Sequence, residues 1–115
     1  MRYFPVFLDL KQKSCLVVGA GNVGLRKAKT LLDCETGDLL LIDPHPPSRD
    51  LEQLLQNPCC RFEQREFVPQ DLENRFLVLA CTSDKELNLN ISQLCKKKNI
   101  LCNVADQPEE GDFVL

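Results

Sequence analysis

Three closely spaced glycines within residues 15–28, CLVVGAGNVGLRKA, constrain the possible fold of this chain more than any other feature. A short apolar run precedes them and helix-compatible residues follow, which predicts a buried strand, a tight turn and a helix. In the pattern Gly19-x-Gly21-x-x-Gly24, the first glycine permits the turn and the second lets the backbone approach a pyrophosphate. The third lets the helix pack closely on the strand. The same glycines also suit a turn that holds no ligand, so other segments must decide.

Short apolar runs alternate with helical periodicity along the rest of the chain. Strands are predicted over residues 15–18, 39–43, 61–67, 76–81, 100–105 and 111–115. Helices are predicted over residues 22–33, 49–57 and 84–98, the last with Ser83 and Glu86 as a capping box. Such alternation implies βαβ units and a mostly parallel sheet. We therefore expect one α/β domain over residues 1–115, with a Rossmann-like, doubly wound sheet that stops after its sixth strand.

Composition and charge exclude several classes of protein. The formal net charge of −3 argues against a protein that coats nucleic acid, because such domains are normally basic. No apolar run approaches the roughly 20 residues of a membrane span, and the N-terminus does not resemble a signal peptide. We therefore expect a cytoplasmic protein without a nucleic-acid or membrane partner.

The cysteines and the histidine suggest no metal site. The seven cysteines are scattered without a C-x-x-C pair, which favours neither a disulfide framework nor a zinc site. Cys15, Cys81 and Cys102 lie in or beside apolar runs, where we expect small buried thiols. The single histidine, His45, lies between prolines and is expected to be a solvated loop residue.

An acidic residue ends the second predicted strand. Asp43 follows Gly24 by 19 residues, a spacing at which a carboxylate can accept hydrogen bonds from an adenosine ribose. Its charge would also disfavour the extra phosphate of NADP. The alternative is that Asp43 only initiates the turn before Pro44. With the glycine turn, it predicts an NAD site whose candidate residues here are Gly19, Gly21, Asn22, Val23, Gly24 and Asp43.

Two further loops follow strands and should reach the same edge of the sheet. In CTSD, Thr82 and Ser83 can line the nicotinamide side, although both also suit the start of a helix. In NVAD, Val104 is a further candidate for cofactor contact, and Asp106 lies just past the end of the strand. Asp106 also suits a simple turn before Pro108.

Segments from the whole chain together resemble one family. FPVFLDLKQKSCLVVGAGNVGLRKAKTLL, LACTSDKELNLNI and ILCNVADQPEEGDFVL are similar to the N-terminal domain of siroheme synthase, the precorrin-2 dehydrogenase and sirohydrochlorin ferrochelatase family. The matching features include an apolar N-terminal strand with Pro5, the segment 81–84 with Leu87 and Asn88, and the Cys-Asn-Val-x-Asp motif at 102–106. Cys81 stands where the family pattern has Ala.

This resemblance implies NAD-dependent oxidation of precorrin-2, a tetrapyrrole, to sirohydrochlorin, with iron insertion in bifunctional members. It implies that Asp106 is the catalytic residue, because it matches the aspartate of the family's Asn-Val-x-Asp motif. Family members continue past the residue matching Phe113 into a region that forms the dimer and much of the substrate pocket. We therefore expect a homodimer for the full-length form, with that region absent from this chain.

A regulatory module that senses NAD without catalysis is the alternative hypothesis. It shares the strand, the glycine turn and the acidic residue, but it does not require CNVAD or the N-terminal strand with Pro5. Turnover of precorrin-2, as opposed to nucleotide binding alone, distinguishes the two hypotheses.

Overall fold

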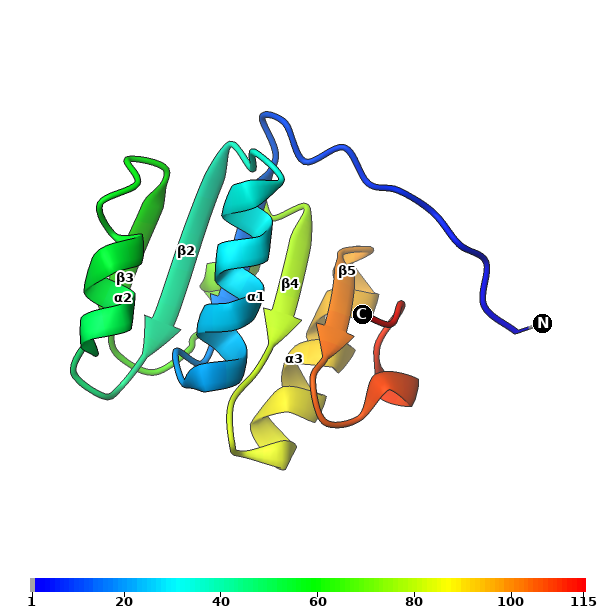
Figure 1. The fold of residues 1–115 in the computed structure, drawn as a ribbon. Helices are drawn as coiled ribbons and strands as arrows, with labels where there is room; N and C mark the ends of the chain where they lie inside the picture. Colours follow the sequence, from blue (N-terminus) through cyan, green and yellow to red (C-terminus); the bar gives the residue numbers. More distant parts are fainter. Residues whose placement is uncertain (1) are drawn as a thin grey trace.

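The alternating strands form one parallel sheet in the computed structural model, which describes residues 2–115 (Figure 1). The strands are β1 (Ser14–Val18), β2 (Asp38–Asp43), β3 (Cys60–Gln64), β4 (Leu77–Ala80) and β5 (Leu101–Val104). The α-helices are α1 (Asn22–Asp33), α2 (Arg49–Leu54) and α3 (Lys85–Lys98). Two short 3-10 helices are η1 (Pro69–Leu72) and η2 (Pro108–Glu110). The sheet order is β3-β2-β1-β4-β5, which confirms the doubly wound α/β class.

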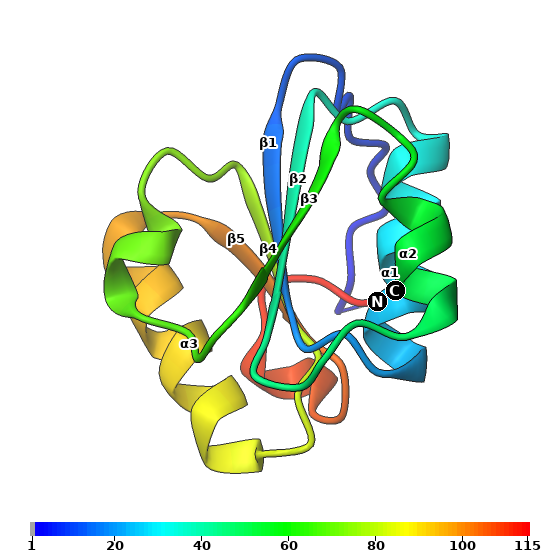
Figure 2. The same cartoon turned by 90° about the vertical axis from the view of Figure 1, so that its left-hand side faces the viewer.

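Helices cover both faces of the sheet, with α1 and α2 on one face and α3 on the other (Figure 2). Both faces are apolar, as expected for parallel strands buried on two sides. Val17, Leu41 and Leu79 belong to the core layer beneath α1 and α2. Leu16 and Ile42 belong to the layer beneath α3. The direction of winding reverses between β1 and β4, which is where such sheets bind ligands.

The third helix is capped differently from the sequence prediction. Its N-cap is Asp84, whose Oδ1 accepts hydrogen bonds from the backbone N–H groups of Glu86 and Leu87 at 3.0 and 3.2 Å. The predicted capping box from Ser83 is therefore wrong, because an aspartate one residue later supplies the acceptor for the first turn. At the other end, Asn99 adopts a left-handed conformation with φ 58° and stops the helix. No helix among residues 2–115 has the length and apolar character to span a bilayer.

The predicted sixth strand is wrong. Residues 111–115 run beside β5, but they make a single backbone hydrogen bond to it, from Asp112 N to Cys102 O at 2.7 Å. The neighbouring N–H of Cys102 donates to the Asp112 carboxylate at 3.0 Å instead of to a carbonyl. Because a side chain takes the position of the next backbone acceptor, no ladder develops.

The predicted N-terminal strand with Pro5 is also not formed. Residues 2–9 contain no strand, and the first pairing is an isolated bridge between Lys11 and Thr36. The large apolar side chains exposed in this segment are Tyr3, Phe4, Val6, Phe7 and Leu8. An extended segment needs a neighbouring strand for its hydrogen bonds, and none of the described residues supplies one here.

Candidate functional site

A cleft of about 740 Å³ lies at the carboxyl ends of the strands, around the switch between β1 and β4. In Figure 1 these carboxyl ends are at the lower edge of the sheet, where the arrowheads of β2, β4 and β5 lie. The residues singled out from the sequence that line this cleft are Gly19, Gly21, Asn22, Val23, Asp43, Thr82, Ser83 and Asp106. The parallel sheet thus brings together loops that are up to 87 residues apart, from Gly19 to Asp106.

Two of the three glycines are required by packing. Gly19 has φ 104°, and a Cβ there would lie 2.7 Å from the carbonyl carbon and oxygen of Cys81. A Cβ on Gly24 would lie 1.8 Å from the carbonyl oxygen of Gly19, so α1 begins in direct contact with the turn. Gly24 is buried by this contact and does not line the cleft. The strand, the turn and the helix therefore pack as the glycine pattern predicts.

Gly21 differs from its two neighbours because a Cβ there would meet nothing within 4 Å. Packing does not require this glycine, and its backbone faces open space in the cleft. Gly21 is also the N-cap of α1 and makes no side-chain hydrogen bond to the first turn. The N–H groups at the start of α1 therefore remain available to a ligand, together with the positive end of the helix dipole.

Asp43 ties the glycine turn to the end of β2. Its Oδ2 accepts a hydrogen bond from Ala20 N at 2.7 Å, and its Oδ1 accepts one from His45 N at 2.8 Å. His45 Nδ1 lies 2.7 Å from the same Oδ1. Burial opposes ionisation, but the hydrogen bonds from Ala20 and His45 outweigh it and hold the pKa of Asp43 below its usual value. Asp43 thus begins the turn before Pro44 and also lines the cleft, so the two interpretations from the sequence do not exclude each other.

The loop after β4 is ordered by a residue of α3. Asn88, which is 1% exposed, accepts hydrogen bonds from Thr82 N at 3.2 Å and Thr82 Oγ1 at 2.6 Å. Its Nδ2 donates to Thr82 O at 2.9 Å. From the sequence, Asn88 was identified only as part of a family motif. A polar residue at a helical position that should face the core was a signal that Asn88 has a buried hydrogen-bond partner, but it did not identify that partner.

Asp106 and Val104, which lie at or just past the end of β5, differ in whether they line the cleft. Asp106 is exposed and lines the cleft, in the turn that follows the strand. Val104 is 1% exposed and packs in the core layer beneath α3, so its side chain does not reach the cleft. Ala105, which lies between them, lines the cleft and donates its N–H to Ala80 O at 3.1 Å.

The segment after β3 lines the cleft and was missed in the sequence analysis. Arg65, Glu66 and Phe67 were assigned to the third strand, which instead ends at Gln64. Arg65 leaves the sheet to form a two-point ion pair with Asp71, with N–O distances of 2.6 and 2.9 Å. The position of this segment at the carboxyl end of a parallel strand was the available signal.

Cys81 also lines the cleft, between β4 and Thr82. It is partly buried, whereas Cys15 and Cys102 are fully buried as predicted, and all seven thiols are free. Burial raises the pKa of Cys81 to about 11, and the charge of Lys27 only partly opposes this effect. The thiol therefore lines the cleft as an uncharged group at physiological pH.

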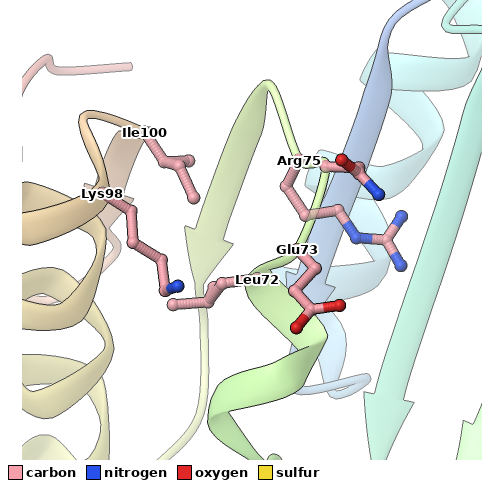
Figure 3. Close-up of a pocket in the computed structure, with 6 residues that line it drawn as sticks. Leu72, Glu73, Arg75, Lys98 and Ile100 are labelled. Atoms are coloured by element: carbon pink, nitrogen blue, oxygen red, sulfur yellow. The ribbon is translucent and has the colours of Figure 1, made fainter.

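A second, shallower hollow of about 450 Å³ lies at the opposite edge of the sheet (Figure 3). Its lining residues are Leu72, Glu73, Asn74, Arg75, Lys98 and Ile100. Arg75 points away from the hollow towards β1 and β2, where its Nη1 lies 3.2 Å from Asp38 Oδ2 (Figure 3). None of the candidate residues from the sequence reaches this hollow, and its arginine is already paired.

Comparison with known proteins places this architecture in a family. Residues 6–115 match the family described as "Putative NAD(P)-binding". The chain belongs to this NAD(P)-binding family. Its cofactor is accordingly a nicotinamide dinucleotide.

Individual relatives agree with the resemblance found in the sequence motifs. The siroheme synthase of Nitrosomonas europaea is 36% identical over 115 residues, which are 100% of this chain and 24% of that protein. The siroheme synthase of Thioalkalivibrio sulfidiphilus is 38% identical over 114 residues, 99% of this chain and 23% of that protein. The chain thus spans about a quarter of the length of these curated relatives.

A solved structure shares the fold of this NAD(P)-binding chain. The protein "SirC, precorrin-2 dehydrogenase" matches with a TM-score of 0.83 at 26% identity. The match covers 98% of this chain and 54% of that one. The sheet, the glycine turn and the loops around the cleft therefore belong to an architecture shared along nearly the whole chain.

Proposed function

We propose that the protein binds NAD in the cleft between β1 and β4 and uses it to oxidise precorrin-2 to sirohydrochlorin in siroheme biosynthesis. The observation that carries the proposal is that one cleft joins the glycine turn, Asp43 and Asp106. Relatives named siroheme synthase and a similar structure named precorrin-2 dehydrogenase support the choice of substrate.

The residues of the cleft fit a dinucleotide. The backbone at Gly21 is open, since a Cβ added there would meet nothing within 4 Å, and it adjoins the free N–H groups at the start of α1. This combination suits a pyrophosphate, because the N–H groups and the helix dipole both favour negative charge. Asn22 and Val23 would supply further backbone contacts there, and Thr82 and Ser83 would line the nicotinamide side.

Asp43 is the residue that favours NAD over NADP in this proposal. Its carboxylate lies beside the glycine turn, at the end of β2, where the ribose of the adenosine would lie. A 2′-phosphate at the same place would meet a like charge, which is unfavourable. The lowered pKa of Asp43 keeps that charge present at neutral pH.

Asp106 is the catalytic residue in this proposal. A bound nicotinamide would accept the hydride that leaves precorrin-2. The oxidation also releases a proton, which the exposed Asp106 carboxylate that lines the cleft would accept. Hydride and proton together account for the two hydrogens lost by the substrate. We further propose that the protein is cytoplasmic and acts as a homodimer.

The test compares Asp106→Asn with Glu109→Gln, which removes an exposed carboxylate three residues further along. We expect Asp106→Asn to bind NAD as tightly as the parent and to lose oxidation of precorrin-2 by about 100-fold or more, measured from NADH formation. The control should retain the parent rate. Unchanged turnover in Asp106→Asn would remove its catalytic role. NAD binding by the parent protein without any turnover would favour the regulatory alternative.

A further inference from the structure

His45 occupies the side of Asp43 that faces solvent. The Asp43 side chain is 15% exposed and the His45 side chain is 84% exposed. Asp43 Oδ2 is taken by Ala20 N, and both the backbone N–H and the ring Nδ1 of His45 contact Oδ1. The acidic group that would meet a ribose is therefore half of a carboxylate–imidazole pair, and the imidazole is its exposed half.

The charge of this pair depends on one proton. With a neutral imidazole the pair carries one negative charge, and with a protonated imidazole it carries none. An imidazole ordinarily titrates near pH 6.5, within the range in which proteins work. His45 is the single histidine of the chain. No other side chain that lines the cleft ordinarily gains a positive charge in this pH range.

The other charged residues around the cleft do not change the net charge of the Asp43–His45 pair near neutral pH. They are Arg65, Glu66, Asp84 and Asp106. Arg65 is neutralised by Asp71, at 2.6 and 2.9 Å, and by Glu63 at 3.0 Å. Gln64, at the end of β3, contacts this turn with a neutral side chain, whose Nε2 donates to Pro44 O at 3.3 Å. Asp43 is the charged group in direct contact with the imidazole.

We propose that His45 makes the choice between NAD and NADP depend on pH, because its protonation removes the net negative charge that a 2′-phosphate would meet. This inference rests on the proposed binding of a dinucleotide with its ribose beside Asp43. The neutral imidazole leaves the pair anionic and selects NAD. The protonated imidazole cancels the carboxylate charge and adds a cationic donor for the phosphate. By linkage, NADP binding must in turn favour protonation of His45.

The test measures the dissociation constants of NAD and NADP by calorimetry at a series of pH values from about 5 to about 9. In the parent protein, the ratio Kd(NADP)/Kd(NAD) should rise at least about tenfold with pH. The variant His45→Gln keeps a neutral donor but does not titrate. Its ratio should change only through ionisation of the 2′-phosphate itself, which also titrates near pH 6.

Arg49→Gln is the matched control, since it removes an exposed cation near this turn that does not titrate in this range. It should leave the pH profile of the ratio unchanged. A second readout uses the single histidine, whose imidazole resonances report its titration directly by NMR. The midpoint of that titration should move to higher pH when NADP is added, but not when NAD is added.

The outcomes separate this inference from the proposed function. If NAD binds and His45→Gln shows the same pH profile as the parent, the role of His45 is wrong while the NAD site stands. If NAD binds at none of these pH values, the proposed function fails and the role of His45 fails with it. A parent-specific rise in the ratio, with the upward shift of the imidazole titration, supports both.

Discussion

The side-chain amide of Asn88 holds the backbone of Thr82 from both sides, accepting its N–H at 3.2 Å and donating to its carbonyl at 2.9 Å. Asn88 is buried in α3, whereas Thr82 is in the loop after β4. The same loop packs against Gly19, where an added Cβ would lie 2.8 Å from Thr82 N. One buried amide therefore fixes the distance between α3 and two of the loops that form the cleft.

Asn88→Ala should lower the free energy of unfolding by about 2–3 kcal/mol, because the N–H and carbonyl of Thr82 lose their partners. Asn90→Ala makes the same substitution at an exposed position of the same helix and should change stability by less than about 0.5 kcal/mol. Urea denaturation of both variants measures the difference. Equal midpoints for the two variants would show that this amide does not hold the loop.

The glycines should separate folding from binding. Gly24→Ala places a Cβ 1.8 Å from Gly19 O, so the backbone must shift, and we expect a loss of at least about 3 kcal/mol in stability. Gly21→Ala meets no atom within 4 Å and should leave stability within about 1 kcal/mol of the parent. It should nevertheless weaken NAD binding by about tenfold or more, because the Cβ fills the space proposed for the pyrophosphate.

Calorimetric titration of NAD into folded Gly21→Ala, with thermal melting of both variants, tests this separation. NAD affinity in Gly21→Ala equal to that of the parent would place the pyrophosphate elsewhere. A stable Gly24→Ala protein would contradict the close contact between α1 and the turn.

The features of the site that depend on periodicity and on the glycine pattern were predictable from the sequence. Alternating apolar runs predicted the five strands of the sheet, and a parallel sheet necessarily gathers Asp43, Thr82 and Asp106 at one edge. Gly19 and Gly24 have the packing roles that their spacing predicted. These features follow from local patterns and from a few topological rules, so a single sequence is sufficient to predict them.

Features that depend on side-chain contacts between elements were not predictable in this way. The contact between Asn88 and Thr82, and the pair between Arg65 and Asp71, join residues six positions apart in different elements. The sixth strand failed because Asp112 offers its side chain to Cys102 N, a detail that residue type alone does not specify. The side chain of Val104 packs in the core beneath α3, and the contact of this residue with the cofactor stays a prediction.

Acid should destabilise the fold through Asp71. Burial opposes ionisation of this carboxyl, but hydrogen bonds from Arg65 and Val68 N hold its pKa below the usual value of 3.8. Because the pKa is lower in the folded state than in the unfolded state, the stabilisation is fully present above about pH 4. It is lost as the pH falls from there through the folded-state pKa.

Asp71→Asn should lower stability at pH 7 by about 1.5–3 kcal/mol and flatten the decline in stability below pH 4. Asp33→Asn removes an exposed carboxylate at the end of α1 and should leave both the stability and its acid dependence nearly unchanged. Denaturation curves between about pH 3 and pH 7 measure both effects. A parent-like acid profile in Asp71→Asn would assign the acid sensitivity to other carboxylates.

The thiols should differ in reactivity according to exposure and pKa. Cys34 is exposed and Cys59 is partly exposed, so iodoacetamide should label both at about pH 8. Cys81 lines the cleft, but with a pKa of about 11 only about one thiol in a thousand is ionised at that pH. It should therefore remain unlabelled, although it adjoins open space. Its labelling should increase steeply as the pH is raised towards 11.

Mass spectrometry of peptides after brief labelling of the native protein measures each site separately. The unfolded protein, in which all seven cysteines are accessible, gives the reference rates. Cys34→Ser should leave the behaviour of Cys81 unaltered, because the two cysteines are in different elements. If Cys81 is labelled at pH 8 as fast as Cys34, its side of the cleft is solvated. Its thiol is then not a neutral group beside the proposed nicotinamide site.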